Sequence, residues 1–229
     1  MNFIFVEFWE ALYVGRKERQ RKKTFVIFCE GKTEYNYFGA VKSVNIDIVL
    51  KPVNMGGGGY KSFLEIVKKN GNINRLATFI IVDGDRAQNI PGELAALKEL
   101  QNYCSQQNRR DSESPYFLIV NSPDFEYIAC LHDPEYFEGD TTRHIEKFFK
   151  FKNLDDFKKN TEIYKLLNSD SRSYQQMITK LKNRRPRMIS TQFERKNIFI
   201  IFQDTAVDWS LINDKNSNIE EFFSIVTGD

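Results

Sequence analysis

The chain has 229 residues, which is enough to bury one good core and to carry a smaller appendage. Its 33 Lys and Arg residues nearly cancel its 31 Asp and Glu residues, so overall charge alone does not attract nucleic acid and any such contact must be local. Cys29, Cys104 and Cys130 are far apart and lack metal-ligand spacing, which argues against a disulfide framework or a structural zinc site. We therefore expect three buried thiols in a cytoplasmic protein.

Residues 1–23 are the first of three expected units, an apolar segment followed by a basic linker. Glu7 and Glu10 interrupt the apolar residues 1–14, and the basic run GRKERQRKK follows this segment instead of preceding it, unlike a secretion signal. The segment is also too short to cross a membrane, and we expect no membrane association. We expect an amphipathic helix that packs on the body or on a partner, and a linker that is either solvated or binds phosphate.

Residues 24–135 are expected to form an α/β core. Strands are predicted at four apolar runs, 25–29, 45–49, 77–82 and 116–120. Helices are predicted between and after them, at 34–41, 60–69, 92–107 and 123–131. The first and third strands are apolar enough to be buried on both faces, and the alternation of strands with helices predicts a parallel sheet flanked by helices.

Residues 136–229 differ in composition, being richer in Lys, Phe, Asn and Asp, and are expected to form a mainly helical extension packed on the core. Helical stretches are predicted near 142–151, 154–167, 174–183 and 218–226. The apolar run NIFIIF is the one candidate strand in this part. The basic stretch KLKNRRPR at 180–187 is either a solvated helix end or a patch that contacts a nucleic-acid backbone.

The two strongest predicted strands each end in carboxylates. Glu30 follows the first, and Asp83 and Asp85 follow the third. The carboxyl ends of parallel strands lie along one edge of a sheet, so these acids should converge. In extended backbone Asp83 and Asp85 would point to the same side, and such oxygens suit Mg²⁺ or Mn²⁺. The alternative is that the DGD triplet is only a turn and a helix N-cap.

The segment EGKTE, residues 30–34, contains the GKT of a phosphate-binding P-loop, but the earlier Gly that this motif requires falls on Val26 inside the strand. We therefore exclude ATP binding there. We expect a short turn at Gly31, a helix capped by Thr33 and an acid, Glu34, in its first turn. Lys32, Thr33 and the backbone of this helix start would then meet a phosphate. The glycine run 56–59 fails the same P-loop test and is either a plain loop or a loop that faces substrate.

With EGKTEYNYF, VDGDR and NSPDFEYIACLHD in this order, residues 23–133 resemble the RloB-like branch of the Toprim superfamily. The resemblance implies a Toprim-like fold in which Glu30, Asp83 and Asp85 form a metal-dependent phosphoryl-transfer site. The related OLD-type nucleases imply further acids or metal ligands, which here fall on Glu34, Ser122, Asp124 and Glu126. The NSPDFE segment departs from the usual S-N-P-C-F-E, since Asn121 and Ser122 are exchanged and Asp124 stands where Cys is common.

The resemblance also implies a function and a context. We expect Mg²⁺-dependent or Mn²⁺-dependent hydrolysis of DNA or RNA, tRNA included. We expect the protein to act in a bacterial defence system with an ATPase partner, and homo-oligomers are a further expectation. The residues expected to bind phosphate are Lys32, Thr33, Arg86, Arg184 and Arg185. The alternative is a non-catalytic module that binds nucleic acid or a partner. A phosphatase of the haloacid dehalogenase type is disfavoured, because its DxD follows the first strand of its sheet.

Overall fold

The structure is a computed structural model that describes residues 23–43, 45–70, 75–184 and 186–228. The expected apolar N-terminal segment and nearly all of the basic run that follows it lie outside these residues, as does Arg185.

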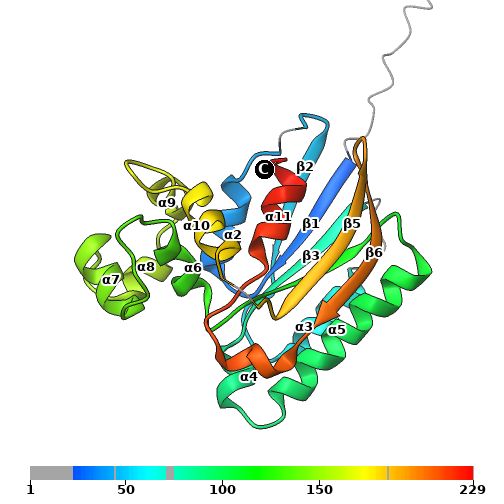
Figure 1. The fold of residues 1–229 in the computed structure, drawn as a ribbon, viewed down its shortest axis with the longest axis horizontal. Coiled ribbons are helices and arrows are strands. Elements are labelled where there is room, and N and C mark those ends of the chain that lie inside the picture. Colours follow the sequence, from blue (N-terminus) through cyan, green and yellow to red (C-terminus); the bar gives the residue numbers. More distant parts are fainter. Residues whose placement is uncertain (1–22, 44, 71–74, 185, 229) are drawn as a thin grey trace, which may run out of the picture.

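A four-stranded parallel sheet lies at the centre of the molecule (Figure 1). Its strands are β1 (Lys23–Cys29), β2 (Ile48–Asn54), β3 (Arg75–Asp83) and β4 (Tyr116–Asn121), in the order β2-β1-β3-β4. The central strands β1 and β3 are buried along most of their length, as their unbroken apolar runs predict, whereas the edge strand β2 is partly exposed. The predicted α/β class with a parallel sheet is therefore confirmed.

Helices cover both faces of the sheet because successive strand residues point to opposite sides. Phe25 and Ile27 of β1 belong to one apolar core with α2 (Lys32–Ala40), α6 (Phe125–Leu131) and α11 (Ile219–Val226). Val26 and Phe28 belong to a second core, on the other face. The helices of that second face are α3 (Tyr60–Lys69), α4 (Asp85–Asn89) and α5 (Glu93–Arg110).

A lobe of short helices follows the last strand of the sheet and lies beside α2 and α6 (Figure 1). It consists of α7 (Thr141–Phe148), α8 (Leu154–Lys158), α9 (Ile163–Leu167) and α10 (Tyr174–Lys182). The single helix expected over 154–167 is wrong, because the side chain of Asn160 accepts a hydrogen bond from the Glu162 backbone N–H (2.8 Å) and turns the chain between α8 and α9.

An antiparallel hairpin follows this lobe, formed by β5 (Ile189–Lys196) and β6 (Phe199–Val207). The run NIFIIF, predicted as a strand, lies in the turn and in β6. The sequence did not predict β5. Asn197 adopts a positive φ of 57° in the turn, and Phe193 packs against Phe117 of β4 with ring centroids 5.7 Å apart. The expectation of a mainly helical segment thus needs correction at residues 189–207. A 3₁₀ helix, η1 (Trp209–Asn213), then leads to α11.

No helix within the described ranges is long and apolar enough to cross a membrane.

Candidate active site

Strand β1 delivers Glu30 to the carboxyl edge of the sheet. Cys29 is in register with Ile81 of β3, and the Glu30 backbone N–H donates to the Ile81 carbonyl (3.2 Å). The Glu30 side chain turns toward the end of β3, where its Oε2 accepts a hydrogen bond from the backbone N–H of Asp83 (2.9 Å). The predicted convergence of Glu30 and Asp83 is confirmed.

The chain leaves β3 at Gly84 and does not stay extended. Gly84 has helical dihedrals, with φ −89° and ψ −14°, and Asp85 is the first residue of α4. The premise that Asp83 and Asp85 share an extended backbone is therefore wrong, although both line one cavity. A Cβ on Gly84 would lie 3.2 Å from the Ser122 Cβ, and the Gly84 N–H donates to the Asn121 carbonyl (2.7 Å), so the turn needs the absence of a side chain.

Two further acids come from helix starts. Glu34 lies in the first turn of α2 and Glu126 in the first turn of α6, and both side chains are buried although each carries an ionisable group. Asp124 is the N-cap of α6, and its Oδ1 accepts a hydrogen bond from the Tyr127 backbone N–H (2.8 Å). Asp124, which departs from the family pattern that this sequence resembles, therefore has a capping role here.

These acids surround a cavity of about 430 Å³, which we call the acid cavity. It is lined by Glu30, Gly31, Lys32, Thr33, Glu34, Asp83, Asp85, Arg86, Glu126, Asp155, Lys158 and Lys159. Six of these side chains are acids and four are cations, so with every acid ionised, as a bound cation would favour, the lining has a formal charge of −2. That charge matches a divalent cation.

Crowding and burial raise the pKa of Glu30, Glu34 and Asp83, which disfavours the ionised form of each. Burial raises the pKa of Glu30 to about 7, against the opposing effect of the hydrogen bond from Asp83. Burial, with Glu126 and Glu30 nearby, raises the pKa of Glu34 to about 7 as well. The pKa of Asp83 is raised well above its usual value by burial and then by Glu34 and Glu30. Its Oδ1 atom is buried and has no hydrogen-bond partner among the described residues.

Lys158 of α8 is a cation at this site that sequence reasoning missed. Its Nζ lies 3.2 Å from Glu126 Oε1, and its backbone carbonyl accepts a hydrogen bond from the Thr33 hydroxyl (3.1 Å). Thr33 is therefore not the cap of α2, because its hydroxyl is directed to α8 and the N-cap residue is Gly31. No motif marks Lys158, since Thr33 and Lys158 are 125 positions apart in sequence and meet only through packing.

The other predicted phosphate-binding residues divide into two groups. Lys32 and Arg86 line the acid cavity, and Arg86 Nη2 also lies 3.5 Å from Glu93 Oε1. Arg184 does not line this cavity; it pairs with Glu138 in a different depression of the surface. Arg185 lies outside the described residues.

Ser122, a predicted metal ligand, does not reach the acid cavity. Its side chain is buried, its Oγ donates to the Ile212 carbonyl (2.8 Å), and it accepts a hydrogen bond from Gln88 Nε2 (2.8 Å). Both partners hold the hydroxyl in the protein interior. Ser122 therefore has a structural role.

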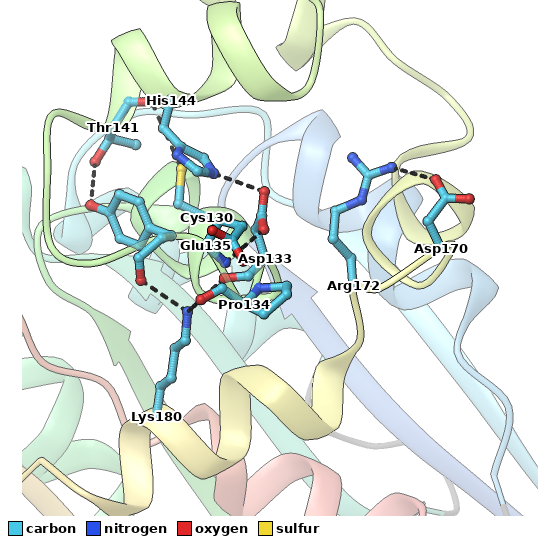
Figure 2. A network of polar contacts seen from close by, with 10 residues as sticks. Cys130, Asp133, Pro134, Glu135, Thr141, His144, Asp170, Arg172 and Lys180 are labelled. Carbon is cyan, nitrogen blue, oxygen red and sulfur yellow. Dashed lines mark hydrogen bonds and ion pairs between the residues drawn. The ribbon is translucent and has the colours of Figure 1, made fainter.

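Both histidines are buried, and neither lines the acid cavity. His132 is fully buried, and its ring nitrogens lie 2.8 Å from the Tyr37 hydroxyl and 3.0 Å from the Ile128 carbonyl. Burial lowers the pKa of His132 to about 4. His144 Nε2 lies 3.0 Å from Asp133 Oδ2 (Figure 2). All three cysteines are buried and free.

The donor set fits a hard divalent cation in its chemistry. Carboxylate oxygens are the ligands that Mg²⁺ prefers, and it keeps several waters of its own. The unpartnered Oδ1 of Asp83 and the charge of −2 are the observations that support this fit. Among the described residues, however, no three His, Cys, Asp or Glu side chains already gather closely enough to hold one ion between them. Binding would require the carboxylates around the cavity to close inward or to act through water.

Comparison of this chain with models of known protein families, with curated proteins and with solved structures found no match.

Proposed function

We propose that this protein is a nuclease that hydrolyses phosphodiester bonds of DNA or RNA at the acid cavity, with Mg²⁺ or Mn²⁺ as cofactor. The observation that carries the proposal is the meeting of buried acids from β1, β3, α2 and α6 around Asp83, whose Oδ1 has no hydrogen-bond partner among the described residues. An unpaired buried carboxylate costs several kcal/mol, on the order expected for one desolvated ion, and a bound cation offsets that cost.

Each residue of the acid cavity has a proposed role. Glu30, Asp83 and Asp85 would hold the metal ion. When bound, such an ion lowers the pKa of a water molecule and stabilises the charge of the reacting phosphate. Glu34 and Glu126 lie on the α2 and α6 side, where Lys158 already neutralises Glu126. Lys32, Arg86 and Lys159 face the same space and would offset phosphate charge.

The wider context comes from the resemblance of EGKTEYNYF and VDGDR to the RloB-like branch of the Toprim superfamily. On that basis the protein would act in the bacterial cytoplasm in antiviral defence, with an ATPase partner, and would form homo-oligomers. The substrate would be DNA, tRNA or another RNA.

A second candidate function is a Toprim-fold module that binds nucleic acid or a partner without catalysis. The observation that favours it is that no three metal-ligating side chains of the described residues gather around one point. In that case the acids would bind a structural ion or none.

Cleavage assays on matched variants separate the two functions. Purified protein is incubated with Mg²⁺ or Mn²⁺ and with plasmid, single-stranded DNA or total tRNA. Each reaction is run with and without the proposed ATPase partner. Asp83→Asn should lower the cleavage rate by at least about 100-fold, the order seen when a group that stabilises transition-state charge is lost. The matched control is Asp155→Asn, an exposed acid on the rim of the same cavity, which should cleave nearly as well as the wild type. Equal cleavage by wild type and Asp83→Asn would show that the nuclease proposal is wrong.

A further inference from the structure

A second depression in the surface, of about 470 Å³, lies between the end of α6, the loop 134–139 and the end of α10. We call it the aromatic pocket, and it is lined by Leu131, Tyr136, Phe137, Glu138, Lys180, Asn183 and Arg184. The Phe137 side chain is 81% exposed, although a large apolar ring in solvent contributes nothing to folding. The acid cavity and the aromatic pocket share no lining residue.

The loop that carries Phe137 is firmly held. Lys180 Nζ donates hydrogen bonds to the backbone carbonyls of Asp133, Pro134 and Tyr136, and Figure 2 shows the ammonium group directed into this loop. The Tyr136 hydroxyl donates to the Gly139 carbonyl (2.9 Å), which closes the far side of the loop. The exposed ring is thus presented by a braced backbone, which lowers the entropy cost of binding a ligand on it.

One cation lies over the Phe137 ring, and two more lie beside the loop that carries it. Lys180 Nζ lies 5.6 Å from the centre of the Phe137 ring. Arg184 pairs with Glu138, and its guanidinium lies 5.5 Å from the centre of the Tyr127 ring. Lys215 Nζ lies 3.3 Å from the Glu138 carbonyl oxygen, on the same loop. An exposed aromatic ring with basic side chains beside it is the arrangement by which proteins bind single-stranded nucleic acid.

Helix α6 joins the aromatic pocket to the acid cavity. Glu126 in its first turn lines the acid cavity and Leu131 at its end lines the aromatic pocket. These residues are separated by about 7.5 Å along the helix axis and by about 140° around it, at about 1.5 Å and about 100° per residue. The two sites therefore lie on different sides of one helix, and a strand with a phosphate at the acid cavity would have to pass around α6 to reach Phe137.

We propose that the aromatic pocket binds an unpaired base of a single nucleic-acid strand, with the base stacked on Phe137 and the neighbouring phosphate beside Arg184. The inference rests on the proposed function for its choice of polymer, but not on catalysis. It assigns Phe137 to substrate binding and to a preference for single-stranded or locally opened nucleic acid.

The test measures binding of a labelled oligothymidine, about 12 nucleotides long to exceed the site of one small domain, by fluorescence anisotropy. The parent protein carries Asp83→Asn, so that Mg²⁺ can be present without cleavage. Phe137→Ala should weaken binding roughly 5- to 150-fold, the effect of removing one stacked aromatic side chain. Phe137→Trp should restore it. The matched control is Phe199→Ala, another exposed Phe with a lysine, Lys23, over its ring, at the opposite edge of the sheet, and it should leave the affinity unchanged.

An oligomer of the same length without bases completes the comparison. If the base stacks on Phe137, Phe137→Ala has no effect on the affinity for this abasic strand. Arg184→Gln should lower the slope of log affinity against log salt by about 0.7 on both strands, because one phosphate contact is lost.

The inference is overturned if Phe137→Ala binds oligothymidine as tightly as the parent, if it weakens abasic and normal strands equally, or if the parent binds neither. Unchanged binding by Phe137→Ala together with cleavage by the wild-type protein would remove this inference and leave the proposed function intact. Base-dependent binding without cleavage by the wild-type protein would support this inference and remove the proposed function.

Discussion

Buried acids occur in two regions of this molecule, and their partners differ. In α11, Glu221 accepts hydrogen bonds from the Thr191 backbone N–H (2.7 Å) and from Asn218 Nδ2 (3.2 Å). Glu220 lies 2.9 Å from Arg187 Nη1 as an ion pair, although neither of its carboxylate oxygens has a hydrogen-bond partner among the described residues. In the acid cavity, Asp83 Oδ1 has no hydrogen-bond partner among the described residues, and three of the groups that raise the pKa of Asp83 most are the carboxylates Glu34, Glu30 and Glu126.

A raised pKa does not separate the two regions, because burial raises the pKa of Glu221 to about 8. The partners do separate them. The α11 acids join the last helix to the hairpin and to the segment before it, which is a structural use of charge. The acids of the acid cavity raise one another's pKa, as Glu34 and Glu30 raise that of Asp83, and this arrangement suits a cation supplied from outside.

The largest expected effect is a loss of stability when the ion pair between Arg187 and Glu220 is removed. Glu220→Ala leaves the Arg187 guanidinium, whose side chain is largely buried, without its ion partner. Removing one member of such a pair costs about 3 to 5 kcal/mol. Urea unfolding should show this loss without metal and with metal. A loss below about 1 kcal/mol would mean that the α11 acids are as poorly paired as those of the acid cavity.

Glu30→Gln should raise the stability of the folded protein, whereas Glu220→Ala should lower it. The pKa of Glu30 is raised from 4.5 to about 7 in the folded protein, so its ionised form is disfavoured by folding. This destabilisation is absent below pH 4.5, grows as the pH rises toward 7, and stays constant above that. The neutral variant should therefore be more stable than the wild type at pH 8 in EDTA, by at most about 3 kcal/mol, and equally stable at pH 4.

Unfolding curves of both proteins across this pH range check the sign. A variant that is less stable than the wild type at pH 8 would contradict the account of Glu30 as a crowded, poorly paired acid.

Metal binding should distinguish the same two regions. Mn²⁺ should raise the melting temperature of the wild-type protein, and Asp83→Asn should weaken Mn²⁺ binding by at least about 100-fold, the upper end of the effect of lost outer-shell groups. Glu221→Gln should leave Mn²⁺ binding unchanged. Isothermal titration calorimetry on the three proteins measures this, and equal effects of the two substitutions would mean that the partners of a buried acid do not identify the site.

The smallest expected effect concerns two adjacent lysines of the acid cavity, Lys158 and Lys159. Lys158 pairs with Glu126, whereas Lys159 lines the cavity and has no ion pair to an acid within the described part of the chain. Lys158→Gln should free Glu126 and tighten Mn²⁺ binding or add a second ion, by about 10-fold in affinity, the order of one charge acting over roughly 12 Å with an effective dielectric near 20. Lys159→Gln is the matched control. Equal responses of the two variants would show that Lys158 does not compete with metal.

Sequence alone predicted the parallel sheet and the place of its two main acids. Unbroken apolar runs can be buried only between two layers of helices, and the rule that parallel strands end at one edge brings Glu30 and Asp83 together. These are consequences of local periodicity and of a general topology, so no knowledge of distant contacts was needed.

Other features were decided by the tertiary structure. The hydroxyl of Ser122 is turned to the Ile212 carbonyl, 90 positions away, and Lys158 reaches Glu126 because α8 packs on α2. Strand β5 alternates apolar and polar residues weakly, and its partners are β6 and the edge of β4. The direction of a side chain in a loop and the pairing of a weak strand depend on which distant segment packs against them, and no local pattern in this sequence carries that information.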